Sequence, residues 1–271
     1  MSITLVRARR GAPQPMTVGG HLAELRRRVL VIGVALVVTC TVAFIAYPQI
    51  LHWLQAPYCR VSPRCALYVT GPLDGLSLRV HVAMYAGAFL ASPVVSWHVW
   101  RFVTPGLRPN EKRYVVPFVA ASVVLFAAGA SLALVSLPHA LRFLGTVGGP
   151  TLQQIYDPNK YVGLVMALMA VFGLTFEFPV VLVALELVGV VSPSKLASWR
   201  RGAIVVIVAG AAIITPSGDP FSMLALAVPL YVFYEVSIVI GKLLRGRAAR
   251  AQPGSSSQSP SSSPDAVEPS P

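Results

Sequence analysis

Two carboxylates in this sequence are embedded among basic residues. Glu24 precedes Arg26–Arg28, and Glu111 precedes Lys112 and Arg113. A carboxylate binds a guanidinium through two parallel hydrogen bonds. Such charge-assisted bonds contribute about 1.5–3 kcal/mol, whereas screening reduces an exposed pair to roughly 0–1 kcal/mol. Two interpretations are open: local salt bridges to the adjacent arginines, or binding of a ligand that carries paired guanidinium groups and an apolar segment to add buried area.

A second set of acids lies within long apolar segments. Glu177, Glu186 and Glu235 each interrupt a stretch that is otherwise hydrophobic. A charge at the centre of a membrane span costs about 2.5–3.5 kcal/mol, so these acids are functional candidates unless they are paired inside the protein. Glu177 is followed closely by Pro179, and proline removes an amide donor and kinks a helix. A kinked span with a buried acid favours a concave pocket that water can reach.

The sequence lacks the motifs of common enzyme classes. Neither GxxxxGK[ST], HExxH nor GxSxG occurs. The pair His21 and Glu24 is too small a set for a metal site, so we expect no enzyme, no metal and no other cofactor. Of the three cysteines, Cys40 lies in an apolar run, while Cys59 and Cys65 share one loop without zinc-site spacing.

Membrane helices must position these acids. Charged residues make up 12% of the 271 residues, about half of the roughly 25% of soluble proteins, and apolar residues make up 55%. The net charge is +12, but the basic residues lie in short clusters between long apolar runs, which excludes a nucleic-acid-binding domain. We predict an all-α polytopic membrane protein whose six spans cover 29–46, 75–103, 114–137, 161–191, 202–214 and 221–240, with loops at 48–72 and 138–160.

The last two predicted spans are short. The 202–214 run has 13 residues, or roughly 20 Å at 1.5 Å per residue, against a bilayer core of about 30 Å. The 221–240 run carries Pro229 and Glu235. We expect a short hairpin that thins the membrane locally or stops before one face, with a re-entrant buried loop as the alternative.

The basic residues predict an orientation. Of the 22 Lys and Arg residues, 17 lie in the N-terminal segment, 101–113, 192–201 and 242–250, which places both termini in the cytoplasm. Cys59 and Cys65 then face the outer compartment, where a disulfide is an open possibility if that compartment is oxidising. We expect three regions: a mobile cytoplasmic N-terminus (1–20), a membrane domain (21–241), and a tail (242–271) that is basic and then disordered and Ser/Pro-rich.

Four segments resemble the TatC family, the polytopic core subunit of the twin-arginine protein translocase. They are similar to the family's motifs in the same order, and the resemblance extends from about His21 to Gly241. The segments are His21-Leu-Ala-Glu24-Leu-Arg26, Val99-Trp100 through Arg113, Phe172-Gly-Leu-Thr-Phe-Glu177-Phe-Pro179, and Thr215-Pro216-Ser-Gly-Asp219-Pro220-Phe221-Ser222.

The resemblance implies a glove-shaped fold with a concave face and a role in exporting folded proteins. Such proteins bind signal peptides with two consecutive arginines, act with single-span TatA or TatB subunits in a multimeric complex in the bacterial cytoplasmic membrane, and depend on the proton-motive force. The resemblance assigns Glu24, Glu111 and Arg26 to signal-peptide binding, Glu177 and Thr215 to buried polar or partner-docking positions, and Pro57 and Asp219 to functional positions of the outer loops. Met223 replaces a glutamine found in many relatives, which makes the docking surface less polar.

A different function class also fits the intramembrane acids. Glu177, Glu186 and Glu235 could form the proton relay of a secondary transporter for a small solute. Such a transporter would couple solute and proton flux without partner subunits, and many transporters are built from internal repeats. The sequence has no visible repeat, which favours the translocase.

Overall fold

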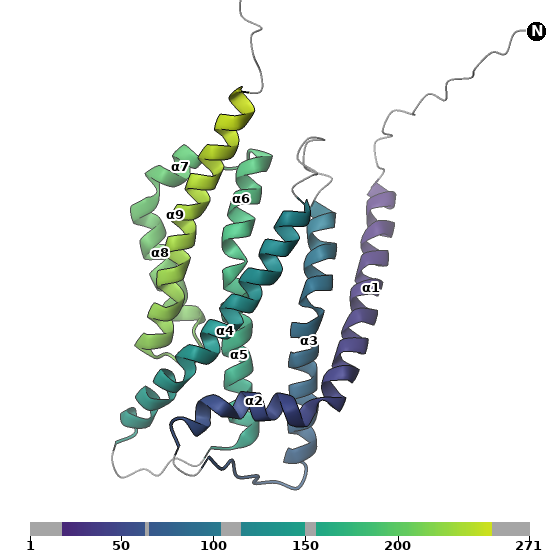
Figure 1. The fold of residues 1–271 in the computed structure, drawn as a ribbon, viewed down its shortest axis with the longest axis vertical. Coiled ribbons are helices and arrows are strands. Elements are labelled where there is room, and N and C mark those ends of the chain that lie inside the picture. The colour runs from purple at the N-terminus through teal and green to yellow at the C-terminus, as the bar shows by residue number, and fades with distance from the viewer. Residues whose placement is uncertain (1–17, 63–64, 104–114, 150–155, 251–271) are drawn as a thin grey trace, which may run out of the picture.

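The structure is a computed structural model that describes residues 18–62, 65–103, 115–149 and 156–250. Within these ranges every regular element is a helix and most helices run along the long axis, while α2 lies across one end (Figure 1). The helices are α1 (Val18–Ile45), α2 (Tyr47–Cys59), α3 (Asp74–Val103), α4 (Val115–Val147), α5 (Pro158–Phe176), α6 (Phe178–Val188), α7 (Pro193–Ser198), α8 (Arg200–Ile214) and α9 (Pro220–Arg250).

Five segments of the described chain are long and apolar enough to cross a membrane: Ala23–Ile45, Asp74–Phe102, Val116–Val147, Pro158–Val188 and Pro220–Leu243. Helix α8 has 15 residues, or roughly 22 Å at 1.5 Å per residue, and does not span a 30 Å core unaided. The predicted all-α polytopic class is confirmed. The sixth span and the glove shape stay predictions.

The helices differ from the expected spans mainly at their ends. The prediction of a loop over 48–72 was wrong for its first half, because α2 occupies Tyr47–Cys59. Pro48 lies in the first turn of α2, where no amide donor is needed. Helix α4 continues past Pro138 to Val147, although 138–160 was expected to be a loop. Likewise, α9 continues to Arg250, so the basic start of the expected tail is helical.

Two glycines bring α4 and α5 into direct contact. A Cβ atom on Gly129 would lie 2.5 Å from the carbonyl oxygen of Phe172, and one on Gly173 would lie 2.8 Å from the Phe126 ring. Small residues at such crossings allow membrane helices to approach closely. The crossing places Phe126 against α5, one turn before the junction at Glu177 that separates α5 from α6.

The main apolar core lies away from α1. Among the described side chains, the core draws on α2–α6, α8 and α9, with Tyr161, Phe172 and Leu226 fully buried. Helix α1 packs chiefly on α3, and a Cβ atom on Gly87 would overlap Cys40. Most of the apolar side chains of α1 face outward, so α1 is attached to the bundle mainly through α3.

Candidate functional site

Arg28 links Glu24 to the end of α3. The Arg28 guanidinium forms an ion pair with the Glu24 carboxylate four residues earlier, and its Nη1 donates to the His98 carbonyl oxygen at 3.0 Å. The same guanidinium lies 6.0 Å from the centroid of the Phe102 ring. Arg28 is only 9% exposed, whereas Arg26 is exposed. In this structure, therefore, Glu24 pairs locally, and its partner is Arg28.

Glu111 lies outside the described residues. The helices on either side of it, α3 and α4, end and begin at the same end of the bundle as Glu24 (Figure 1). The contact between Arg28 and His98 is five residues before the end of α3 at Val103. Both basic segments that resemble the TatC family are thus connected to one end of the fold, which we call the Glu24 end.

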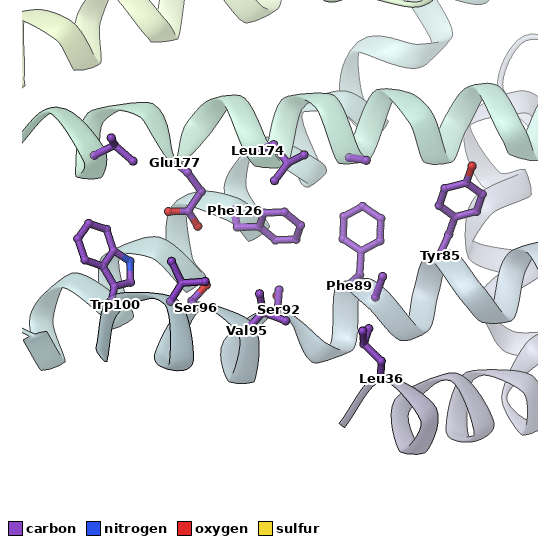
Figure 2. A pocket seen from close by; sticks show the side chains of 14 residues that line it. Leu36, Tyr85, Phe89, Ser92, Val95, Ser96, Trp100, Phe126, Leu174 and Glu177 are labelled. Carbon is purple, nitrogen blue, oxygen red and sulfur yellow. The ribbon is translucent and has the colours of Figure 1, made fainter. Parts of the chain in front are cut away.

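A pocket of about 450 Å³ lies between α3 and the α5–α6 junction. Most of its walls are apolar, and among the described residues that line it Glu177 is the one acidic side chain. Figure 2 shows the Glu177 carboxylate pointing into the pocket toward the α3 side chains Trp100 and Ser96. The lining residues are Leu36, Tyr85, Ala88, Phe89, Ser92, Val95, Ser96, Val99, Trp100, Phe126, Ala170, Leu174, Glu177 and Val181.

The helix is interrupted at Glu177. Helix α5 ends at Phe176 and α6 begins at Phe178, with Pro179 in the first turn of α6, as the sequence predicts for this segment. Glu177 is half-buried, and its carboxylate lies near the Ser122 hydroxyl of α4. At this interruption the Glu177 carboxylate points into an apolar pocket.

Trp100 of α3 is hydrogen-bonded to Ser122 of α4. Its indole Nε1–H donates to Ser122 Oγ at 2.7 Å, and Ser122 is fully buried. The indole ring also stacks on Phe118, with the ring centroids 5.1 Å apart. The hydrogen bond between Trp100 and Ser122 thus joins α3 to α4, and Trp100 and Glu177 line the same pocket.

The other intramembrane acids lie elsewhere. Glu235 pairs with Arg200 of α8 at 2.8 Å and accepts a hydrogen bond from Tyr231. Glu186 is 3% exposed, and its carboxylate packs directly on Gly241 of α9. Neither acid lines the pocket that contains Glu177. For Glu235 the internal pairing that the sequence left open is present.

The predicted outer-loop residues have structural partners at the opposite end of the bundle, which we call the α2 end. Asp219 is 1% exposed and caps α9, because its Oδ1 accepts from the Ser222 amide at 2.7 Å. Thr215 is buried at the end of α8, where its hydroxyl donates to the Ala211 carbonyl. It does not line the pocket with Glu177, so these two predicted partner positions belong to separate regions.

A disulfide bond lies at the C-terminal end of α2. Cys59 and Cys65 are bonded, with their Cα atoms 4.6 Å apart. Pro57 is buried in the last turn of α2, beside the buried Tyr58. The Tyr156 and Tyr58 rings pack edge to face, with their centroids 5.5 Å apart. Burial is the main cause that raises the pKa of Tyr156 above its usual value, and the Tyr58 phenol is a smaller one. The disulfide that the sequence left open is therefore present.

Sequence reasoning did not single out three residues of the site: Arg28 among the arginines next to Glu24, and Trp100 and Ser122. The spacing of Glu24 and Arg28 signals a helical i, i+4 pair and could have identified Arg28. No comparable signal existed for Trp100 and Ser122, which are 22 residues apart and on different helices.

A family model described as Sec-independent protein translocase protein (TatC) matches residues 20–229. The chain belongs to the TatC family. A TatC protein of Frankia casuarinae is 41% identical over 261 residues, covering 92% of this chain and 72% of the relative. A TatC protein of Aquifex aeolicus is 34% identical over 226 residues, covering 82% and 93% respectively.

A solved structure agrees with the TatC assignment. The crystal structure of a twin-arginine translocase receptor, TatC, is 33% identical to this chain and superimposes with a TM-score of 0.68, covering 83% of this chain and 99% of the other. Membership of the TatC family makes this chain a component of a Sec-independent protein translocase rather than an enzyme. It gives no support to the solute-transporter alternative.

Proposed function

We propose that this TatC family member is the receptor for twin-arginine signal peptides, with Glu24 and Glu111 binding the two guanidinium groups. The observation that carries the proposal is that Glu24 is held by Arg28 at the same end of the bundle as the helix ends that flank Glu111. A carboxylate that binds one guanidinium is oriented to bind another. Its two oxygens have about four lone-pair sites, so a ligand guanidinium can bind Glu24 beside Arg28 or replace Arg28. Exposed Arg26 then contributes positive potential beside the site.

The apolar part of the ligand needs its own surface. Two exposed ion pairs contribute only about 0–1 kcal/mol each, so burial of the hydrophobic segment of a signal peptide must supply most of the affinity. We infer that Glu177 provides a polar point in the bilayer, either for the inserted signal hairpin or for a partner span. Its support is the 450 Å³ apolar pocket into which the carboxylate points (Figure 2).

The wider setting follows from the same proposal. Both termini lie in the cytoplasm of a bacterial cell. The reason is that 17 of the 22 Lys and Arg residues are in the terminal segments and the loops expected on the same side, and basic residues are enriched on the cytoplasmic side of membrane proteins. TatA-type or TatB-type single-span subunits complete the translocase, and the proton-motive force drives export of folded cargo. Thr215, Pro57 and Asp219 support assembly from the α2 end.

Crosslinking of a twin-arginine signal peptide tests the binding role. We expect Glu24→Gln and Glu111→Gln each to weaken crosslinking and the double variant to abolish it. Glu235→Gln is the matched control, because Glu235 pairs with Arg200 and lies outside the proposed site. Undiminished crosslinking in the double variant would reject the proposal, as would topology mapping that places His21–Arg28 and Pro105–Arg113 on opposite faces of the membrane.

Export assays test the role of Glu177. Glu177→Ala is expected to block export of twin-arginine cargo while signal-peptide crosslinking at the Glu24 end persists. Normal export in Glu177→Ala would reduce Glu177 to a structural residue. Solute-coupled proton flux in vesicles that contain this chain alone would instead favour the transporter alternative.

A further inference from the structure

The last turn of α3 contacts both acidic sites. The His98 carbonyl accepts from Arg28, and Phe102 faces the same guanidinium. Trp100 lies between these two residues in sequence and donates its indole N–H to Ser122, whose hydroxyl lies near Glu177. We propose that this turn, residues 98–102, couples the occupancy of Glu24 to the position of the Glu177 carboxylate, with Trp100 and Ser122 as positioning residues. The ligand-driven part of the coupling rests on the proposed function.

Arg28 is the first step of the coupling. Its guanidinium has five N–H donors in a fixed plane, so its contacts with Glu24, the His98 carbonyl and the Phe102 ring constrain one another. An arriving guanidinium competes with Arg28 for the Glu24 carboxylate. Any rotation of Arg28 away from Glu24 therefore changes its contacts with the His98 carbonyl and the Phe102 ring in the last turn of α3.

Trp100 is the second step, because an indole N–H only donates hydrogen bonds. By donating to Ser122 Oγ at 2.7 Å, it occupies an acceptor site and leaves the single O–H of Ser122 to donate elsewhere. We infer that the Glu177 carboxylate, which lies near Ser122, accepts that bond. Chains of this kind strengthen their members, since the bond from Trp100 polarises the hydroxyl toward the acid.

Another serine of α4 shows what a helical serine does without such a constraint. Ser131, on the same helix, is exposed and donates to its own backbone at the Ala127 carbonyl, 2.7 Å away. Serine in a helix commonly makes this i−4 bond. If Trp100 withdraws, Ser122 can turn to the carbonyl of Phe118 in the same way and release Glu177. The turn of α3 thereby determines whether the Ser122 hydroxyl donates to the Glu177 carboxylate or to the Phe118 carbonyl.

Packing makes Trp100 follow its helix turn. The indole is 9% exposed and stacks on Phe118, and Ser122 has no exposed surface. A side chain that is packed on one face and hydrogen-bonded at its tip has no room to compensate for a shift of its backbone. The same shift that loosens Arg28 from His98 is therefore transmitted to Ser122.

Indole NMR of the full chain in nanodiscs tests the coupling without a ligand. The chain has four tryptophans, so ¹⁵N labelling gives four indole resonances, and Trp100→Phe assigns the one of interest. We expect both Arg28→Gln and Ser122→Ala to shift the Trp100 resonance. Arg27→Gln and Ser131→Ala are the matched controls and leave it in place. A Trp100 resonance that moves in Ser122→Ala but not in Arg28→Gln would overturn the coupling, and one that moves in neither would overturn the hydrogen-bond chain as well.

A second arm adds a synthetic twin-arginine peptide. The peptide is expected to shift the Trp100 resonance in the wild type and to leave it unchanged in Glu24→Gln. If Arg28→Gln shifts the resonance but the peptide does not, the coupling within the chain stands and the proposed receptor function fails. If the peptide crosslinks normally yet leaves Trp100 unmoved, the receptor function stands and the coupling to it is rejected.

Export separates positioning from general folding. In Ser122→Ala we expect signal-peptide crosslinking within about twofold of the wild type and export reduced by roughly tenfold, since a hydrogen bond to a charged group is lost. Ser122→Thr keeps a hydroxyl and is expected to restore export, and Ser131→Ala is expected to change neither readout. A parallel fall of crosslinking and export in Ser122→Ala, or no fall in either, would overturn the assignment of Ser122.

Discussion

The two ends of the bundle are built differently. At the α2 end, covalent and buried polar contacts join neighbouring segments: the Cys59–Cys65 disulfide, the Asp219 cap of α9, and the Tyr161 hydroxyl, which donates to the Leu54 carbonyl at 2.7 Å. At the Glu24 end, α1 is joined to α3 through Arg28, whose partners are one carboxylate, one carbonyl and one ring.

The difference shows how such a bundle combines stability with exchangeable contacts. Capping and disulfide bonds at the α2 end fix backbone groups that no ligand replaces. A carboxylate–guanidinium pair, by contrast, can be replaced by a second guanidinium without loss of bond type. We therefore expect substitutions at the α2 end to change global stability and those at the Glu24 end to change local opening.

The largest effect is expected from Asp219→Ala at the α2 end. The change removes the acceptor for the Ser222 amide and the Ser217 hydroxyl in a site that is 1% exposed. Loss of a cap together with a buried unpaired donor is expected to lower the free energy of unfolding by about 2–3 kcal/mol, measured by denaturant titration in detergent. Wild-type stability combined with lost export would instead give Asp219 a direct role in assembly.

Removal of the disulfide is expected to have a somewhat smaller effect. The bond closes a loop with five residues between Cys59 and Cys65, and the chain-entropy model gives such a short loop about 2 kcal/mol. The Cys59→Ser, Cys65→Ser double variant tests this by denaturant titration. As a check on the bond itself, the denatured wild type should show one free thiol, Cys40, before reduction and three afterwards. Three thiols without reductant would contradict the pairing.

Tyr161→Phe tests the contribution of one buried hydrogen bond at the α2 end. The change removes a buried hydrogen bond to Leu54 of α2, and is expected to cost about 1 kcal/mol and to speed amide exchange in α2. The control is Tyr231→Phe, because its bond to Glu235 is long at 3.3 Å. Equal exchange in α2 for both variants would show that Tyr161 does not anchor this helix.

The smallest global effect is expected from Arg28→Ala at the Glu24 end. Because Glu24 is only partly buried, we expect less than about 1 kcal/mol of lost stability. Amide exchange should nevertheless accelerate in the first turns of α1 and the last turn of α3, with no change in α2. Arg27→Ala, at an exposed neighbouring position, is the control. Faster exchange throughout the bundle would remove the distinction between the two ends.

Much of the fold could be predicted from local sequence signals. Long apolar runs predict helices, because a lipid environment leaves no other way to satisfy the backbone of a single span. The helix interruption at Glu177 lies two residues before Pro179, the proline that the sequence marks in this span. The sequence did not predict α2, because prolines are typical of loops, although Pro48 lies where a helix tolerates one.

Some residues of the candidate site could likewise be predicted from the sequence, and others could not. Sequence selected Glu24 and Glu177 because isolated acids on a basic surface or in an apolar span are conspicuous. Sequence did not select Ser122 over Ser131, since both are serines in the same uncharged run. Only the packing of α3 on α4 distinguishes them, because it brings the Trp100 indole to one hydroxyl and leaves the other exposed.

The sequence by itself determined that this chain is a membrane helix bundle with acids at unusual positions, because hydropathy and charge act residue by residue. The tertiary structure decided which groups those acids meet: Arg28 for Glu24 and Ser122 for Glu177. Directional hydrogen bonds require donors and acceptors within about 3 Å, and for residues on different helices only the packing of those helices sets such a distance.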